Sequence, residues 1–364
     1  MHLDIAGDTP GTRRRLQAHV WGKPGARPKI YVQAGLHADE APGMAVAHHL
    51  ETLLRDTEDH VTGEIWVVPM ANPIGLDQWI SHKPQGRQDL ESMQNFNRGY
   101  PDLAALAGDS LDGQLTDDPA GNLDAVRSAF GAALAALPRD TEIDALRLGL
   151  LTWSHDADIV LDLHCDHEAI LHFYAAPLRP EITALLSRAT GASLVLEQEV
   201  SGGNAFDEAH TAPWAALRRR FGDRVPAGCF SATLEYRGQR DVTDAVATED
   251  AARLMVFLGA VGAVSDQSPP AHDLAPVLPL GGAAEHFAPQ GGVVIWNARP
   301  GDRVGKGQRL GEVLDPATGE RLPVTALTDG LLFRREMWRT CRRGQSLCHV
   351  AGPEVLRDGH LLSD

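Results

Sequence analysis

Strand-like and helix-like patterns alternate along residues 29–264, and this alternation limits the folds open to the chain. The segment KIYVQAG at 29–35 has the composition of a buried strand, and apolar residues then recur at helical spacing between Met44 and Leu54. Strands that alternate with helices usually form a mostly parallel sheet with helices on its faces. We therefore predict an α/β fold with a mixed, mostly parallel central sheet and flanking helices.

The same alternation continues through the rest of this part of the chain. Further strands are predicted at residues 16–22, 64–73, 156–166, 170–176, 193–197 and 229–238. Helices are predicted at residues 141–155, from Pro180 onwards, through 214–221 and over 243–264. Residues 81–122 are rich in Gly, Asp, Asn and Pro, which predicts long loops with little regular structure.

The composition and the predicted secondary structure of the chain change after the last predicted helix. Residues 265–276, SDQSPPAHDLAP, are typical of a linker, and the chain beyond them is strand-like and rich in turns. Within it, GDRVGKGQRLGEV at 301–313 is echoed by WRTCRRGQSLCHV at 338–350, each with a turn glycine, a glutamine, a leucine and a closing valine. We therefore predict a catalytic domain at residues 1–264 and an all-β half-barrel domain at residues 277–350.

The composition of the chain argues against some classes of binding partner. The chain has 364 residues with 43% hydrophobic content, and its formal net charge of −16 disfavours binding to nucleic acid or to an anionic membrane. Its four cysteines do not follow a disulfide-scaffold or zinc-ribbon spacing, and its first residues lack the apolar core of a signal peptide. We expect a cytoplasmic protein with reduced thiols. The sequence does not decide between a monomer and a homo-oligomer.

The segment GLHADEAPG at 35–43 follows a predicted strand and places His37 and Glu40 where α/β proteins usually carry their chemistry. In the strand predicted at 156–166, His164 lies on the face opposite the apolar residues. The carboxyl ends of strands in an open sheet share one crevice, so these side chains can converge. A catalytic zinc takes three protein ligands from His, Glu or Asp and keeps one position open. The three residues are therefore candidate zinc ligands.

Simpler explanations exist for each of these residues. A His-x-x-Glu pair arises by chance in a chain with 16 histidines, and a histidine at a strand end is often only hydrogen-bonded. His167 is a rival for the third ligand. Asp39, between a predicted strand and a predicted helix, is explained as the N-cap of that helix. Glu235, near the end of another predicted strand, is explained by a salt bridge with Arg237.

Four motifs occur in a fixed order along the chain. They are GLHADE (35–40), FNRGYP (96–101), DIVLDLH (158–164) and LEYRG (234–238). Together they resemble the zinc carboxypeptidase superfamily, and most closely its succinylglutamate desuccinylase/aspartoacylase family. The resemblance covers residues 28–264 and implies a zinc hydrolase fold, to which members of the family often add a C-terminal β-domain.

The resemblance also implies a role for each matching residue. The zinc ligands that it implies, for one ion per chain, are His37, Glu40 and His164. Glu235 matches the general base of the family. Asn97 and Arg98 match a substrate-binding pair, in which Arg98 contacts a substrate carboxylate or the developing oxyanion.

The chain departs from the family pattern in the loop that carries this pair. Many members have aspartate two residues before the asparagine, whereas this chain has Asn95, so the substrate contacts of this loop are not assigned. A second arginine of the substrate pocket is expected as well. The resemblance does not single it out, and Arg87 and Arg237 are its candidates.

The C-terminal repeat resembles the half-barrels of biotinyl and lipoyl carrier domains, which display a modified lysine at a hairpin tip. The only lysine beyond residue 264 is Lys306, which lies in the first turn of the repeat and not at that tip. Its neighbours Gly305 and Gly307 are free to adopt positive φ, which explains the turn by backbone geometry. We therefore expect the shape of a carrier domain without its modification.

These features together predict a zinc-dependent hydrolase, a deacylase that cleaves the amide bond of a small N-acyl amino acid or a related compound. The alternative enzyme is a metallocarboxypeptidase acting on short peptides. The alternative outside enzymes is a non-catalytic zinc-binding or scaffold protein.

Overall fold

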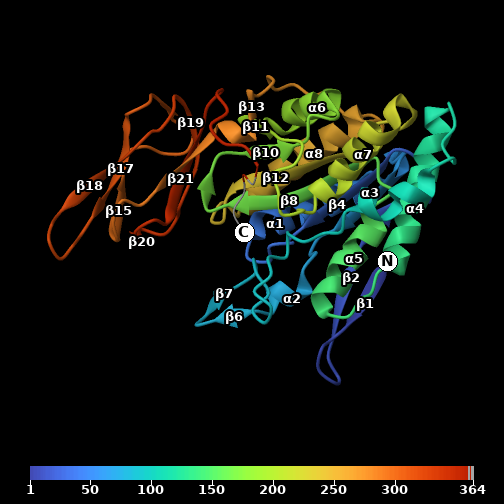
Figure 1. Ribbon diagram of the computed structural model, residues 1–364, viewed down its shortest axis with the longest axis horizontal. Coiled ribbons are helices and arrows are strands. Elements are labelled where there is room, and N and C mark those ends of the chain that lie inside the picture. The colour runs from blue at the N-terminus through green and yellow to red at the C-terminus, as the bar shows by residue number, and fades with distance from the viewer. Residues whose placement is uncertain (360, 362–364) are drawn as a thin grey trace.

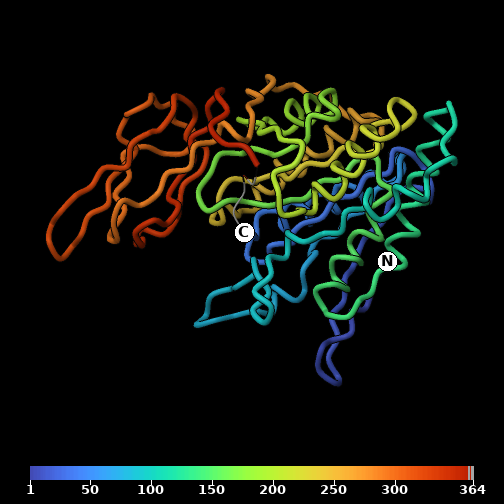
Figure 2. Tube along the Cα trace, in the orientation of Figure 1, coloured from blue at the N-terminus to red at the C-terminus, as the bar shows by residue number. Residues whose placement is uncertain are grey.

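The computed structural model describes residues 1–359 and 361, which form an α/β region and a β-rich C-terminal region (Figure 1). The α/β region is built around an eight-stranded sheet with helices on both faces, and the C-terminal region extends from one end of it (Figure 2). Most neighbouring strands of the sheet are parallel, which confirms the predicted fold class.

The eight strands run in the order β13–β11–β10–β12–β8–β4–β5–β3. Their bounds are β3 (His19–Trp21), β4 (Lys29–Ala34), β5 (Glu64–Val68), β8 (Ile159–Asp166), β10 (His172–Ala175), β11 (Leu194–Glu197), β12 (Phe230–Gly238) and β13 (Val277–Pro279). The pairs β10–β12 and β3–β5 are antiparallel. Two hairpins lie outside this sheet: β1 (His2–Ala6) with β2 (Arg13–Gln17), and β6 (Trp79–Ile80) with β7 (Lys83–Pro84).

Helices cover both faces of the sheet. One face is covered by α1 (Ala41–Asp56), α6 (Pro180–Thr190) and α8 (Asp244–Ala260). The other is covered by α3 (Leu103–Ala107), α4 (Pro119–Ala136), α5 (Glu142–Ser154) and α7 (Glu208–Phe221). The short helical segments are α2 (Pro73–Leu76), η1 (Glu58–His60), η2 (Gly108–Leu111), η3 (Gly222–Arg224) and η4 (Leu280–Gly282).

The central strand β8 has the two faces that its sequence predicts. Ile159, Leu161 and Leu163 pack with α1 and α8, whereas Asp162 and His164 lie on the opposite face together with Val160. The start of α1 packs closely on this strand, because a Cβ on Gly43 would lie 2.6 Å from the carbonyl oxygen of Leu163. A side chain at position 43 would therefore push the beginning of α1, and the turn before it, away from β8.

The prediction of long loops over residues 81–122 is wrong in part. This segment contains α3 and the first residues of α4, a helix with no counterpart among the predicted ones. Asp102 and Asp118 are the N-caps of these helices, and their carboxylates accept backbone N–H groups of the first turns. Pro119 then occupies the start of α4. The residues that suggested loops are thus helix-start signals.

The C-terminal region is built from β-strands, as predicted, and the strands within its two sheets pair antiparallel. One sheet contains β14 (Ala283–Phe287), β21 (Ser346–Ala351), β19 (Gly330–Arg335) and β16 (Arg303–Val304), and the other β18 (Arg321–Thr325), β17 (Arg309–Leu314), β15 (Gly292–Trp296) and β20 (Thr340–Cys341). Both copies of the repeat form a short strand, a turn and a longer strand. Gly307 and Gly344 occupy the two turns with φ of 82° and 79°. Gly305, which was also free to do so, does not adopt positive φ.

Two strand pairings join the regions. β13 adds to the edge of the main sheet beside β11, and β9 (Glu168–Ala169), directly after β8, pairs with β19. The division into residues 1–264 and 277–350 stays a prediction. Within residues 1–359 and 361, no helix has the length and apolar character needed to cross a membrane. The expected cytoplasmic location also stays a prediction.

Candidate metal centre and active site

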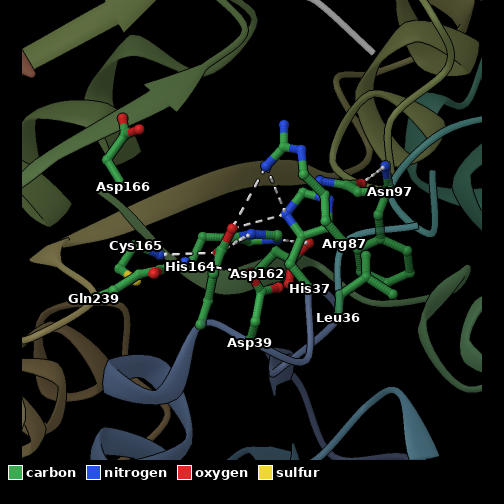
Figure 3. Close-up of polar contacts among 12 residues, drawn as sticks. Leu36, His37, Asp39, Arg87, Asn97, Asp162, His164, Cys165, Asp166 and Gln239 are labelled. Atoms are coloured by element: carbon green, nitrogen blue, oxygen red, sulfur yellow. Dashed lines mark hydrogen bonds and ion pairs between the residues drawn. The ribbon is translucent and has the colours of Figure 1, made fainter. Parts of the chain in front are cut away.

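His37, Glu40 and His164 meet in the interior of the α/β region, beside the carboxyl ends of β4 and β8. Figure 3 shows the two histidines of this group close together. Each offers one ligand atom, and these atoms lie within 4.8 Å of one another. The Nδ1 atoms of His37 and His164 lie 2.9 and 2.8 Å from the two carboxylate oxygens of Glu40. The arrangement can hold a metal ion, and its members are the three ligands expected from the sequence.

Buried polar groups hold the opposite side of each imidazole ring. Asn95 Oδ1 lies at hydrogen-bond distance, 2.9 Å, from His37 Nε2. Asp162 Oδ2 lies 2.9 Å from His164 Nε2 as an ion pair, although the two atoms are not aligned for a hydrogen bond. A metal-binding histidine normally places its second ring nitrogen on such a partner, so the Nδ1 atoms are left for a metal ion. Asn95, which the sequence left without a role, therefore orients a candidate ligand.

The charges of this buried group depend on one another. Burial opposes the Glu40 carboxylate, but His37 and His164 hold its pKa well below the ordinary value. Burial likewise opposes a charged His164, yet Asp162 and Glu40 raise its pKa well above the ordinary value. Burial and then the nearby Arg87 lower the pKa of His37. Strong shifts of this kind are frequent at functional sites.

The turn before α1 directs these side chains inward. Glu40 occupies the N-cap position of α1 but makes no capping hydrogen bond, since its carboxylate faces the two histidines. The prediction that Asp39 caps this helix is wrong. Asp39 lies one residue earlier, and Gln239 Nε2 donates to its Oδ2 over 3.3 Å.

Glu235 stands beside the metal-binding group because β12 and β8 are parallel neighbours in which it pairs with His164. Its Oε2 is buried and has no hydrogen-bond partner among the described residues. Burial, and then the carboxylate of Asp166, raise its pKa well above the ordinary value. The salt bridge with Arg237 is not formed, because Arg237 instead donates to Asp250 over 2.7 and 2.9 Å.

Asn97 and Arg98 line the same cavity as the metal-binding group. Asn97 is held in place by the backbone N–H of Phe206, which donates to its Oδ1 over 2.8 Å. Arg98 Nη1 donates to the carbonyl oxygen of Asn97 over 2.7 Å. Its aliphatic part packs on Gly203, where a Cβ would lie 2.6 Å from Arg98 Cδ. The structure therefore brings both expected substrate-binding residues to the cavity.

The sequence left two questions open: which arginine is the second one of the substrate pocket, and whether His164 or His167 is the third metal ligand. Arg87 lines the cavity, with Nη1 3.6 Å from Glu40 Oε1, whereas Arg237 is turned towards α8. His167 does not join the metal-binding group, since its Nδ1 lies 2.8 Å from Glu336 of the C-terminal region. The structure therefore favours His164 over His167 as the third ligand.

The cavity has a volume of about 100 Å³ and lies over the sheet face that carries Glu235. Its walls include side chains that the sequence did not single out: Asp166, Tyr174, Asp207, Glu208 and Arg334. Alternation along β10 was a usable signal for Tyr174, which pairs with Thr233 of β12. Arg334 comes from β19 in the C-terminal region, and no spacing in the sequence relates it to the site.

The fold and the site define an α/β protein with a His–Glu–His group, able to hold a metal ion, at the carboxyl ends of a mixed sheet. The succinylglutamate desuccinylase/aspartoacylase catalytic domain matches residues 26–217, and the chain belongs to this family. The predicted family is therefore confirmed. No curated protein matched the chain.

Solved structures share the fold over nearly the whole chain. A succinylglutamate desuccinylase/aspartoacylase from Shewanella frigidimarina is 24% identical with a TM-score of 0.86, and 96% of each chain is covered. A family protein from Shewanella amazonensis is 25% identical with a TM-score of 0.83, covering 96% of this chain and 98% of that chain. The ectoine utilization protein from Ruegeria pomeroyi is 18% identical with a TM-score of 0.63, covering 93% and 89%. The shared architecture thus includes the C-terminal region.

Proposed function

We propose that this protein is a zinc-dependent hydrolase that cleaves the amide bond of a small N-acylated amino acid or a related compound. The observation that carries the proposal is the convergence, on one small cavity, of the His–Glu–His group and the buried carboxylate of Glu235. The family to which the chain belongs is named for enzymes that remove acyl groups. One zinc ion per chain is expected.

The donor set fits zinc. Catalytic zinc sites use three protein ligands from imidazole nitrogen and carboxylate oxygen, and the ion would be held by His37, Glu40 and His164. When bound, zinc supplies Lewis-acid chemistry and lowers the pKa of water from 15.7 to about 7. Asn95 and Asp162 would keep both imidazole rings oriented, a contribution typically worth about 10- to 100-fold in metal affinity or activity.

Glu235 would hold and transfer the proton of the reaction. A general base takes the proton of the attacking water and passes it to the leaving nitrogen. The raised pKa of Glu235 suits this task, because proton transfer is most effective when the pKa of the base approaches the working pH. Its Oε2, unpartnered among the described residues, is the atom at which this proton would be held.

Arg98 would bind a carboxylate of the substrate, with Asn97 beside it. A guanidinium matches a carboxylate with two parallel N–H bonds and fixes its orientation. Arg87, on the same wall, is the second arginine that the family pattern leads one to expect. Holding the substrate in this way aligns its amide with the metal-binding group and with Glu235.

The small cavity favours a deacylase over a carboxypeptidase acting on short peptides. Leu280 and Arg334 line it from the side of the C-terminal region, and its volume of about 100 Å³ suits a small molecule better than a polypeptide. A non-catalytic zinc-binding protein is disfavoured by Glu235, because a buried carboxylate without a partner among the described residues costs stability. Such a group is kept where it serves a reaction.

The test is a panel of N-acyl amino acids and short peptides, assayed for released amine with zinc-loaded and chelator-treated protein. We expect release from at least one N-acyl amino acid, lost with the chelator and restored by zinc. Release from peptides alone would identify a carboxypeptidase. Zinc binding without release from any compound would favour a non-catalytic protein.

A further inference from the structure

A buried carboxylate that the proposed reaction does not use, that of Glu208, lies on the wall that α7 contributes to the cavity. Glu208 is only 7% exposed. Its Oε1 accepts hydrogen bonds from the backbone N–H and the hydroxyl of Ser201, whereas its Oε2 has no hydrogen-bond partner within the described residues. Ser201 therefore fixes the carboxylate and leaves one of its oxygens available to a ligand.

The place of Glu208 in the first turn of α7 does not explain this arrangement. An acidic residue there is favourable because it faces the positive end of the helix dipole. An exposed side chain would gain the same benefit and would keep its hydrogen bonds to water. A buried oxygen without a partner instead costs free energy, and a bound donor would offset this cost.

Two more polar residues of α7, Asp207 and Thr211, line the same wall. Thr211 is buried and lies one turn further along the helix, so the three side chains share a helix face. Burial, and then the carboxylate of Glu208, raise the pKa of Asp207 to about 7, which shows that the two acids repel each other. A primary ammonium group has three N–H donors and a positive charge, and it therefore matches two carboxylates and one hydroxyl.

The carboxylate of Asp166, elsewhere on the cavity wall, shows what Glu208 lacks. Arg334 Nη1 donates to Asp166 Oδ1 over 2.7 Å, so the protein itself supplies a cation to that carboxylate. The hydrogen-bond donor to Glu208 is Ser201, which carries no charge. The α7 wall is thus left with a negative charge that a cationic ligand would balance.

We propose that Glu208, together with Asp207 and Thr211, forms a subsite that binds a primary ammonium group of the substrate. This inference deepens the function proposed above and rests on it. The substrate class that fits is an N-acyl compound with a carboxylate for Arg98 and a separate primary ammonium group, as in an N-acylated diamino acid. Glu208 is then a specificity-determining residue, since it also disfavours a methyl group or a carboxylate at this position.

The test compares ligands that differ only in this group. Calorimetry on the purified protein with added zinc compares γ-aminobutyrate with pentanoate, δ-aminovalerate with hexanoate, and ε-aminocaproate with heptanoate. The members of each pair share a carboxylate and a chain length, and a methyl group replaces the ammonium group in the second. We expect at least one ammonium compound to bind roughly 10- to 100-fold more tightly than its methyl partner.

Glu208→Gln should abolish this preference. Its amide keeps an oxygen for the two bonds from Ser201 and loses the negative charge and the second acceptor. Glu199→Gln is the matched control, because Glu199 lines the same cavity but is exposed and paired with Arg219. Removing this equal charge should leave the preference intact.

Three outcomes would overturn the proposal: equal binding of both members of every pair, a preference that survives Glu208→Gln, and an equal loss of preference in Glu199→Gln. If Glu208→Gln does not fold, Glu208→Asp decides the question. Its shorter side chain should weaken the preference or move it to a longer ammonium compound, and an unchanged preference would count against the subsite. If no N-acyl amino acid is hydrolysed, the proposed function fails while the ammonium preference can still be measured.

Discussion

The α/β region and the C-terminal β-region differ in how they bury carboxylates. Asp166, Glu208 and Glu235 line one cavity, and each has a buried oxygen without a hydrogen-bond partner among the described residues. In the C-terminal region, the buried Glu312 is paired with two arginines. An unpaired buried carboxylate lowers the free energy of unfolding, whereas a paired one costs far less. The first region therefore accepts an arrangement that folding alone does not favour.

The two architectures explain this difference. In a mostly parallel sheet, strand ends meet at one edge and neighbouring strands hold residues in register, as His164 and Glu235 are. The antiparallel sheets of the C-terminal region are joined by tight turns and enclose small apolar cores. We therefore expect the catalytic residues in the α/β region. The C-terminal region adds Arg334 to the wall of the cavity. Each prediction below tests one side of this contrast, from the largest effect to the smallest.

Removing a metal ligand should have the largest effect. In His37→Ala or His164→Ala, zinc content should fall from one ion per chain to near zero, because two remaining donors do not complete a catalytic site. Elemental analysis of the purified variants measures this. His167→Ala is the matched control and should keep its zinc, since His167 lies against Glu336 and outside the group. Zinc retained in His164→Ala and lost in His167→Ala would show that the third ligand is misassigned.

Removing the proton acceptor should leave the metal in place and slow the reaction. In Glu235→Gln we expect unchanged zinc content and a fall in kcat of about 10²- to 10⁴-fold, because an amide cannot take a proton from water. This corresponds to roughly 3–5 kcal/mol of activation free energy. Steady-state kinetics with the best substrate of the panel measures the fall. A near-normal kcat would exclude Glu235 as the general base.

The metal-binding residues and Arg334 show how much of the site could be predicted from the sequence. His37 and Glu40 share one turn and His164 follows from alternation within one strand, so local pattern made them candidates. The resemblance to the family was needed to prefer His164 over His167. Arg334 could not be selected in this way, because its place depends on the pairing of β19 with β9, far apart in the sequence. The missed helix α4 has a different cause. Asp118 was counted as a loop residue although it serves as a helix cap.

Changing Arg98 should affect binding more than chemistry. Arg98→Lys keeps the positive charge but loses the parallel pair of N–H donors that a carboxylate accepts. We expect KM to rise by roughly 10-fold with kcat little changed, the pattern of a lost ground-state contact. A fall in kcat at constant KM would assign Arg98 to the developing oxyanion instead. No change in either constant would remove Arg98 from the site.

The acidic wall of the cavity should make stability depend on pH. Burial, and then the carboxylate of Glu208, raise the pKa of Asp207 to about 7 from an ordinary 3.8. The folded protein therefore binds this proton more tightly than the unfolded chain, and the contribution of Asp207 to stability is lost as pH rises from about 4 to 7. Asp207→Asn should be more stable than the original protein at pH 8 by roughly 1–3 kcal/mol, and equal to it near pH 4.

Urea unfolding at the two pH values, with zinc content held constant, measures this difference. The contrasting variant is Asp315→Asn in the C-terminal region. Hydrogen bonds from Ala317 and then Thr318 lower the pKa of Asp315, so its contribution is present at neutral pH and lost as pH falls. Its loss should make the protein slightly less stable at pH 8. The same sign of change in both variants would contradict the contrast between the regions.

Lys306 should contribute least of all. A carrier domain needs a lysine that a ligase can reach at a hairpin tip, whereas Lys306 precedes the turn residue Gly307 and its backbone N–H donates to Asp329 Oδ1 over 2.7 Å. The side chain is exposed, so its replacement removes no buried contact. Lys306→Arg should therefore leave kcat, KM and thermal stability unchanged, and the intact mass of the original protein should show no lipoyl or biotinyl group. An adduct on Lys306 would make the C-terminal region a carrier, and Arg334 would then be only the residue that docks it against Asp166.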